Sequence, residues 1–371
     1  MALRTEEMVL NMGPQHPSTH GVLRLEVELE GELVLNVKPH IGYLHRCFEK
    51  HCEAITYPQV VPYTDRMDYL ASMSNNFGYA VAVERLMDLK VPERVEYIRI
   101  IVAELQRIAS HQVALGTYGV DIGAFTPFLF LFAEREKILS IFEETCGARL
   151  LYNYIWVGGL SHDIHPDFVR KTKEFVRDFK PRIKELNDLL SYNKIFIERT
   201  ANIGILPPDV AVNYGVTGPN LRASGVKWDL RKNDPYSIYD RFDFEIPVGE
   251  GLKGTVGDSW DRYYVRVLEM EQSLRIIEQA IDNIPEGNVQ EAVPKRVKPP
   301  KGTIYSRVEN PKGELGYFII SDGNVNPFRV KVRAPSFVNM EVLGELCKGH
   351  FVADVIAILG SIDVVLGEID R

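Results

Sequence analysis

Three long stretches with a helical spacing of apolar residues constrain the fold of this chain more than any other feature. The first follows Pro92, the second runs from Pro166 to Leu186, and the third runs from Ser259 to Ile281. A proline is tolerated in the first turn of a helix, and apolar residues three and four positions apart then share one face. Long helices bury such faces against one another, so the sequence predicts a helical bundle at the core.

Shorter segments have the alternating pattern of strands. Leu23 to Leu29 alternates apolar and charged residues, and Gly31 turns the chain into Leu33 to Val37, which predicts a β-hairpin with one buried face. Residues 304–332 indicate further strands, and residues 341–360 indicate a short closing helix. The expected fold class is therefore α+β, with a bundle of long helices flanked by small β elements.

We expect one domain, because 45% of the 371 residues are hydrophobic and no internal repeat divides the chain. Its expected parts over residues 1–371 are an N-terminal β region (8–40), a helical core (50–282) with a loop-rich insertion (214–247), a linker (285–301) and a C-terminal β/α region (302–371). The linker is expected at the surface because it contains four prolines.

Charge and hydropathy exclude two classes of function. The net charge of −8 gives no overall basic field for nucleic acid. The most apolar run, Ala124 to Ala133, contains Pro127, whereas a spanning helix needs about 20 apolar residues. We therefore expect no membrane crossing and, because the first residues form no apolar segment, no secretory signal. The four cysteines have no framework spacing, as expected of reduced thiols in a cytosolic compartment.

A group of metal-ligating residue types, His45, Cys47, His51 and Cys52, suggests a zinc site at first. If this stretch is helical, Cys47 and His51 share one face, and His45 and Cys52 share another that is nearly opposite. Four ligands on two faces cannot surround one ion. We therefore expect no metal in this chain.

The glycine string GEGLKG, Gly249 to Gly254, has the spacing of a dinucleotide-binding turn. Such a turn must follow a buried strand and open a helix. This one follows a charged segment and leads into further loop, so we interpret it as a flexible loop.

Three other segments contain groups that could exchange protons. The loop GPQHPSTHG carries His16 and His20, DRMDYL carries Tyr69, and VDIGAFTPF carries Asp121. The histidines could equally be structural and Tyr69 could lie in the core. An aspartate among aromatic residues needs a partner when buried, and His20 would suit.

Six segments together closely resemble the family of D subunits of complex I, NADH:quinone oxidoreductase, in order along nearly the whole chain. They are GPQHPSTHGVLRL, IGYLHR, PYTDRMDYL, VDIGAFTPFLF, LRASGVKWDLRK and GSIDVVLGEIDR. The resemblance implies that His20 and Tyr69 hydrogen-bond the headgroup of a quinone and that Asp121 holds the histidine. It also implies that Arg46 lies near an iron–sulfur cluster carried by a partner subunit.

The implied chemistry suits these residue types. Reduction of a quinone consumes two electrons and two protons, and negative charge develops on the carbonyl oxygens. A phenol and an imidazolium can stabilise that charge and deliver protons.

The resemblance implies a chain that is inactive alone, works with the iron–sulfur subunit and the membrane arm, and lies peripherally on the cytoplasmic side of the cell inner membrane.

The family is similar in fold to the large subunits of nickel–iron hydrogenases, which hold nickel with two cysteine pairs. The matching segments here, residues 66–70 and 364–368, contain no cysteine. Two departures from the family pattern stand out. Cys47 replaces a usual glycine, and Ser161 stands where mitochondrial members have a histidine near the cluster. Loss of that imidazole should lower the cluster's potential, which favours menaquinone over ubiquinone.

Three alternatives remain open from the sequence: a hydrogenase large subunit, a relative that takes electrons from ferredoxin or another donor instead of NADH, and a scaffold without a site of its own. Nickel analysis tests the first. The neighbouring genes bear on the second, and substitution of Tyr69 or His20 bears on the third.

Overall fold

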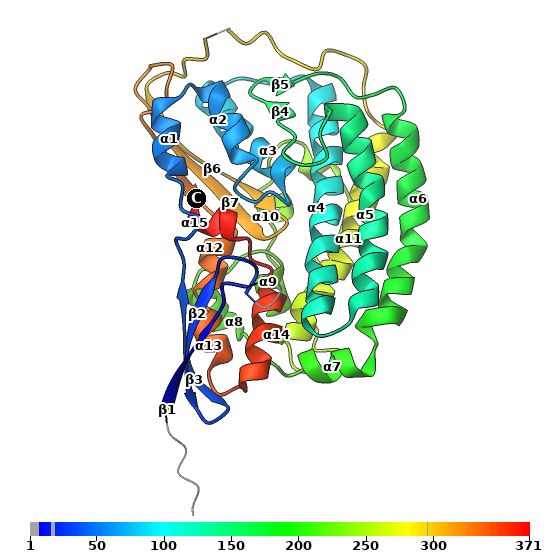
Figure 1. The fold of residues 1–371 in the computed structure, drawn as a ribbon. Coiled ribbons are helices and arrows are strands. Elements are labelled where there is room, and N and C mark those ends of the chain that lie inside the picture. Colours follow the sequence, from blue (N-terminus) through cyan, green and yellow to red (C-terminus); the bar gives the residue numbers. More distant parts are fainter. Residues whose placement is uncertain (1–6, 16–18, 295) are drawn as a thin grey trace, which may run out of the picture.

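In the computed structural model, which describes residues 7–15, 19–294 and 296–371, four long helices lie side by side in one half of the molecule (Figure 1). They are α4 (Glu93–Asp121), α5 (Phe125–Cys146), α6 (Phe168–Leu186) and α11 (Ser259–Ile281). Helix α4 packs against α5 and α11, and α6 also packs against both. The predicted helical core is confirmed.

The ends of these helices follow from local sequence. Pro92 directly precedes α4, and the carboxylate of Asp258 accepts a hydrogen bond from the backbone N–H of Asp261 at 2.8 Å at the start of α11. Pro127 lies in the first turn of α5, where its missing N–H breaks no helical hydrogen bond. None of the helices in the described ranges has both the length and the apolar composition that a membrane span requires.

The predicted N-terminal hairpin is confirmed as β2 (Arg24–Glu30) and β3 (Leu33–His40), which pair antiparallel. A further strand, β1 (Glu7–Met12), pairs with β2 on the other side. The apolar residues of β2 are buried in a smaller core with the C-terminal helices. The sheet therefore holds the start of the chain against its end.

A second antiparallel sheet consists of β6 (Gly302–Asn310), β7 (Gly313–Ser321) and β8 (Arg329–Arg333), as predicted for this region. Helix α3 (Ser72–Leu86) packs on β6 and β7. A short ribbon of β4 (Ile155–Trp156) and β5 (Gly159–Leu160) lies near the top of Figure 1. Together with the helices, these sheets confirm the α+β class.

Short helices connect the larger elements. Those before the bundle are α1 (Phe48–Ala54) and α2 (Tyr57–Thr64). Those between α6 and α11 are α7 (Lys194–Thr200), α8 (Pro208–Asn213), α9 (Pro219–Ala223) and α10 (Leu230–Asn233), with a π-helical turn at Asn187–Ser191 and a 3₁₀ turn at Tyr239–Arg241. Those at the end are α12 (Pro335–Met340), α13 (Leu343–Cys347), α14 (Val352–Ile362) and α15 (Leu366–Asp370).

Residues 341–360 differ from the single closing helix that the sequence predicted, because the chain leaves the helix between α13 and α14. There the N–H of Gly349 donates to the carbonyl of Val34, and the N–H of Val34 donates to the carbonyl of His350, each at 2.8 Å. Backbone groups bound to β3 cannot also continue a helical ladder. Hydrogen bonding to the distant strand β3 therefore interrupts the helix between α13 and α14.

The described residues of 285–301 lie mostly at the surface, as expected from their prolines, and a few of them are anchored to the rest of the protein. The N–H of Leu160 donates to the carbonyl of Val289 at 2.9 Å, which extends the β4–β5 ribbon. Val297 is buried against the main core.

Candidate functional site

The end of helix α4 brings together two of the residues selected from sequence. The Nε2 atom of His20 lies 3.6 Å from Oδ2 of Asp121, whose side chain is only 2% exposed. Burial raises the pKa of Asp121 to about 7. The pair therefore combines a carboxyl group that titrates near neutral pH with an imidazole that is 19% exposed.

Local backbone geometry positions this pair. His20 has a φ of 49°, a left-handed conformation, at the end of the loop in which Thr19 is hydrogen-bonded to Gln15. His16, the other histidine of the loop, lies outside the described residues. On the far side, a Cβ atom at Gly360 of α14 would lie 3.1 Å from Oδ2 of Asp121, so glycine permits the close approach of α14.

Tyr69 lies in the segment between α2 and α3, and 42% of the residue is exposed. Burial of part of the ring raises the pKa of the phenol, the negative charge of Asp68 raises it further, and Lys312 opposes this. The phenol therefore stays protonated at neutral pH and can donate a proton. Whether Tyr69 and His20 face one hollow stays a prediction.

Arg46 is exposed, and its guanidinium donates a hydrogen bond to the backbone carbonyl of Arg66, next to the Tyr69 segment. The loop before Arg46 is held by the end of the chain, since Asp370 accepts hydrogen bonds from the N–H groups of Gly42 and Leu44, both at 2.7 Å. The C-terminal helix α15 therefore fixes the position of Arg46 relative to the Tyr69 segment.

Cys47 lies at the N-terminus of α1 with a φ of 55°, a conformation that favours glycine. This gives a backbone reason for the glycine that the family usually has there. A cavity of about 370 Å³ opens beside it, lined among others by Ile41, His45, Phe337 and Arg371.

The candidate zinc residues are not gathered around one point. The Sγ atom of Cys47 lies 3.8 Å from Nε2 of His45, whereas the ring of His51 stacks on Tyr63 and Cys52 is fully buried. Within the described ranges, no group of three or more histidine, cysteine, aspartate or glutamate residues could hold a metal ion.

The glycine string Gly249–Gly254 lies in a loop, and α11 begins at Ser259. The N–H of Gly251 donates to Oδ2 of Asp261 at 3.0 Å, and the N–H of Gly249 donates to the carbonyl of Arg222 at 2.9 Å. Both backbone N–H groups are thus already hydrogen-bonded within the protein.

Ser161, at the departure from the mitochondrial pattern, lies 2.8 Å from Nδ1 of His162 through its hydroxyl oxygen. The other ring nitrogen of His162 contacts the carbonyl of Thr145, and the ring packs edge-on against Tyr154. The neighbouring imidazole is thereby held by contacts within the chain.

Sequence reasoning missed a buried ionic cluster directly behind Tyr69. The ammonium of Lys312 lies 3.1 Å from Oδ2 of Asp68 and 3.7 Å from Oδ2 of Asp363. Glu368 is fully buried nearby, and burial together with the charge of Asp68 raises its pKa to about 7. The available signal was the resemblance of residues 66–70 and 364–368 to the two cysteine pairs of hydrogenases, whereas the sequence around Lys312 is typical of a solvent-exposed turn.

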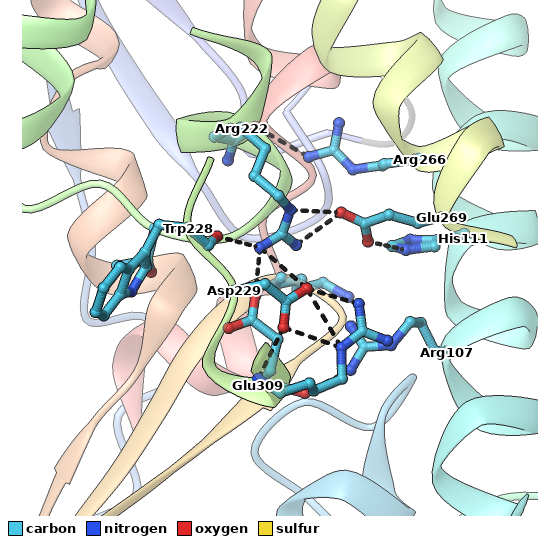
Figure 2. A network of polar contacts seen from close by, with 12 residues as sticks. Arg107, His111, Arg222, Trp228, Asp229, Arg266, Glu269 and Glu309 are labelled. Carbon is cyan, nitrogen blue, oxygen red and sulfur yellow. Dashed lines mark hydrogen bonds and ion pairs between the residues drawn. The ribbon is translucent and has the colours of Figure 1, made fainter. Parts of the chain in front are cut away.

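A second buried network lies between α4, α9, α11 and β6 (Figure 2). Arg222 donates to Glu269 and to Glu309, both at 2.8 Å, and His111 lies 2.9 Å from the other oxygen of Glu269. Burial lowers the pKa of His111. Burial alone would raise the pKa of Glu269, but the charge of Arg222 and the hydrogen bond from His111 hold it well below its usual range. The segment LRASGVKWDLRK thus anchors the loop-rich region to the helices.

Comparison with known proteins identifies the family once this geometry is known. A family model described as respiratory-chain NADH dehydrogenase, 49 Kd subunit, matches residues 121–299 and 290–371. The chain belongs to this family.

Relatives over the full length agree. The D subunits of NADH-quinone oxidoreductase from Chlorobaculum tepidum and Chlorobium luteolum are each 58% identical to this chain over 373 residues. The alignments cover 100% of this chain and 93% and 94% of those relatives. The protein of the same name from Prosthecochloris aestuarii is 56% identical over 373 residues, which cover 100% of this chain and 93% of that relative.

Proposed function

We propose that this chain is the quinone-site subunit of a proton-translocating NADH:quinone oxidoreductase, complex I. Membership of the family supports the assignment to the complex. The observation that carries the quinone site is the His20–Asp121 pair at the end of α4, 3.6 Å apart and largely enclosed.

In this proposal Tyr69 and His20 donate hydrogen bonds to opposite carbonyl oxygens of the headgroup. Two electrons reach the quinone, and each oxygen gains one proton as the quinol forms. Preorganised donors stabilise the charge that develops on the oxygens. When His20 loses its proton, Asp121 is left beside a neutral ring, and protonation of its carboxyl couples quinone reduction to motion elsewhere in the complex.

The electrons come from an iron–sulfur cluster in a partner subunit beside Arg46. The loop before Arg46 supports a covered interface there, because Ile41, Tyr43 and Leu44 are 42%, 58% and 38% exposed. Exposed apolar residues grouped in one loop are typical of a surface that another protein covers. The membrane arm completes the assembly, and the chain lies peripherally on the cytoplasmic side of the inner membrane.

Substitution of Tyr69 by Phe and of His20 by Ala in the assembled complex tests this proposal. We expect the kcat of quinone reduction to fall about a hundredfold or more in each variant, the usual contribution of a positioned acid. NADH oxidation with ferricyanide, which bypasses the quinone, should not change. Normal quinone reduction in both variants would instead support a scaffold with no site of its own.

The quinone itself is proposed to be menaquinone, on the ground that Ser161 replaces an imidazole near the partner's cluster. Substitution of Ser161 by His should raise the reduction potential of that cluster, as measured by redox titration of its paramagnetic signal. An unchanged potential would remove the reason for preferring menaquinone over ubiquinone.

A further inference from the structure

The cluster behind Tyr69 is assembled from four parts of the chain that are distant in sequence. Asp68 lies between α2 and α3, Lys312 lies in the turn between β6 and β7, Asp363 follows α14, and Glu368 belongs to α15. The lysine ammonium contacts both aspartates and also lies 3.2 Å from the hydroxyl of Ser110 on α4. These four charged residues are at most 6% exposed.

The buried charges of this cluster do not balance. The cations are Lys312 and Arg266, whose Nε lies 3.8 Å from Oδ2 of Asp363. Three carboxyl groups, those of Asp68, Asp363 and Glu368, face these two cations. Since an unbalanced charge is costly in a buried site, the cluster is most stable when one carboxyl group keeps a proton.

Glu368 offers a place for that proton. Its Oε2 accepts a hydrogen bond from the N–H of Ser336 at 2.9 Å, whereas Oε1 has no hydrogen-bond partner among the residues that the structure describes. The fully enclosed carboxyl group therefore has one free oxygen that gains from protonation. The pKa of about 7 agrees with a proton that can be held and released near neutral pH.

Tyr69 adjoins this cluster and is also exposed. It directly follows Asp68, and the charges of Asp68, Lys312 and Asp363 all act on the pKa of its phenol. Tyr69 is also 42% exposed, whereas the cluster behind it is closed. The phenol thus lies near enough to the cluster for its charges to act on it, and it is also accessible from outside.

We propose that the Asp68–Lys312–Asp363–Glu368 cluster stores the proton that restores Tyr69 after the phenol has protonated the reduced quinone. This inference rests on the proposed function. The quinone receives two electrons from the partner's cluster, the O–H bond of Tyr69 breaks, and its proton forms a new O–H bond on one quinone oxygen. The phenolate then takes the stored proton from the carboxyl cluster, and solvent later replaces it. The second proton comes from His20.

Several groups on different elements act on Glu368. They are Asp68 in the segment before α3, Lys312 in the β6–β7 turn, Tyr317 on β7 and the N–H of Ser336 on α12. Asp363 acts on the same lysine and is in turn faced by Arg266 of α11. The three carboxyl groups therefore share one proton. Asp68 and Asp363 each have an oxygen in an ion pair, whereas Oε1 of Glu368 has neither an ion pair nor a hydrogen bond among the residues that the structure describes.

Glu368→Gln in the assembled complex tests the proposal. The glutamine carbonyl can still accept from Ser336 but the side chain can no longer store a proton. We expect the kcat of quinone reduction to fall about tenfold below pH 7, where the wild-type cluster holds its proton, with unchanged KM for quinone and unchanged ferricyanide reduction. The loss of rate that the wild type shows as pH rises through about 7 should be smaller in the variant. Glu368→Asp should restore at least part of the rate and of the pH dependence.

Glu96→Gln is the matched control, since Glu96 also has a pKa raised by burial but lies in the first turn of α4, 14 residues before Ser110. It should leave rate and pH profile unchanged. The proposal is overturned if Glu368→Gln keeps the wild-type rate and profile while Tyr69→Phe is slow, or if the Gln and Asp variants are equally slow with the wild-type pH dependence. If Tyr69→Phe itself reduces quinone normally, the proposed function fails first.

Discussion

Replacement of Lys312 by Met should destabilise the region behind Tyr69 by an amount that depends on pH. The methionine is similar in length but leaves Asp68 and Asp363 without the ammonium that lies 3.1 and 3.7 Å from them. Removal of one partner from a buried ion pair costs about 3–5 kcal/mol, because the remaining charge is buried alone. We expect the free energy of local unfolding of this region to fall by about 3 kcal/mol at pH 8. This is the lower end of the range, because the carboxyl groups can relieve part of the cost by taking up protons.

The sign of the pH dependence follows from the same groups. Burial alone would lower the pKa of Lys312, but the carboxylates raise it above its ordinary value, so its stabilisation is present throughout pH 6–8 and is lost only at much higher pH. The pKa of Asp68 is already raised by burial and rises further once Lys312 is gone. Protonation therefore relieves the variant more at pH 6 than at pH 8, and the difference in stability from wild type should widen as pH rises.

Hydrogen–deuterium exchange of the assembled complex measures this loss directly. Protection factors of the amides in residues 66–70 and 363–368 should fall about a hundredfold at pH 8, which corresponds to about 3 kcal/mol. Lys331→Met is the matched control, because that exposed lysine pairs with Glu49 at 3.0 Å on the surface and should cost at most about 1 kcal/mol. A second change, Asp68→Asn, should recover part of the loss. Equal effects of the two lysine variants, or a difference that narrows as pH rises, would refute this reasoning.

Three further predictions concern single substitutions in other parts of the chain. Asp121→Asn should lower quinone turnover about tenfold, abolish coupled proton pumping and reduce the rate change near pH 7, where the buried carboxyl group titrates. Unchanged turnover and pumping would contradict the role given to the His20 pair. Cys47→Gly should stabilise the start of α1 by about 1 kcal/mol, because φ is 55°, and slower exchange of the α1 amides would show it. Gly360→Ala should lower the free energy of unfolding by about 1–3 kcal/mol, because its Cβ would lie 2.6 Å from the ring of Tyr118. An unchanged midpoint of thermal unfolding would contradict that packing.

The long helices could be predicted because their signals are local. Apolar spacing and the prolines at residues 92 and 166 depend on a few neighbouring residues, and so does the hairpin turn at Gly31. The break between α13 and α14 could not be predicted, because it results from hydrogen bonds with β3, over 300 residues earlier in the chain. Periodicity within a segment carries no information about such a partner.

The candidate site likewise contains residues that could be predicted from the sequence and one that could not. His20, Tyr69 and Asp121 were found because the resemblance gave them roles, and the structure brings His20 and Asp121 together. Lys312 was missed because a lysine between proline and glycine in a hairpin turn is usually solvated. Only the folded chain shows that this turn points between α4 and the C-terminal segment, where three carboxyl groups surround the ammonium.

A structure of the assembled complex with quinone bound tests the central claim most directly. We predict that the hydroxyl of Tyr69 and the ring of His20 lie within about 3.2 Å of opposite carbonyl oxygens of one headgroup, the usual limit of a hydrogen bond. A headgroup bound elsewhere, with these two side chains on separate surfaces, would contradict it.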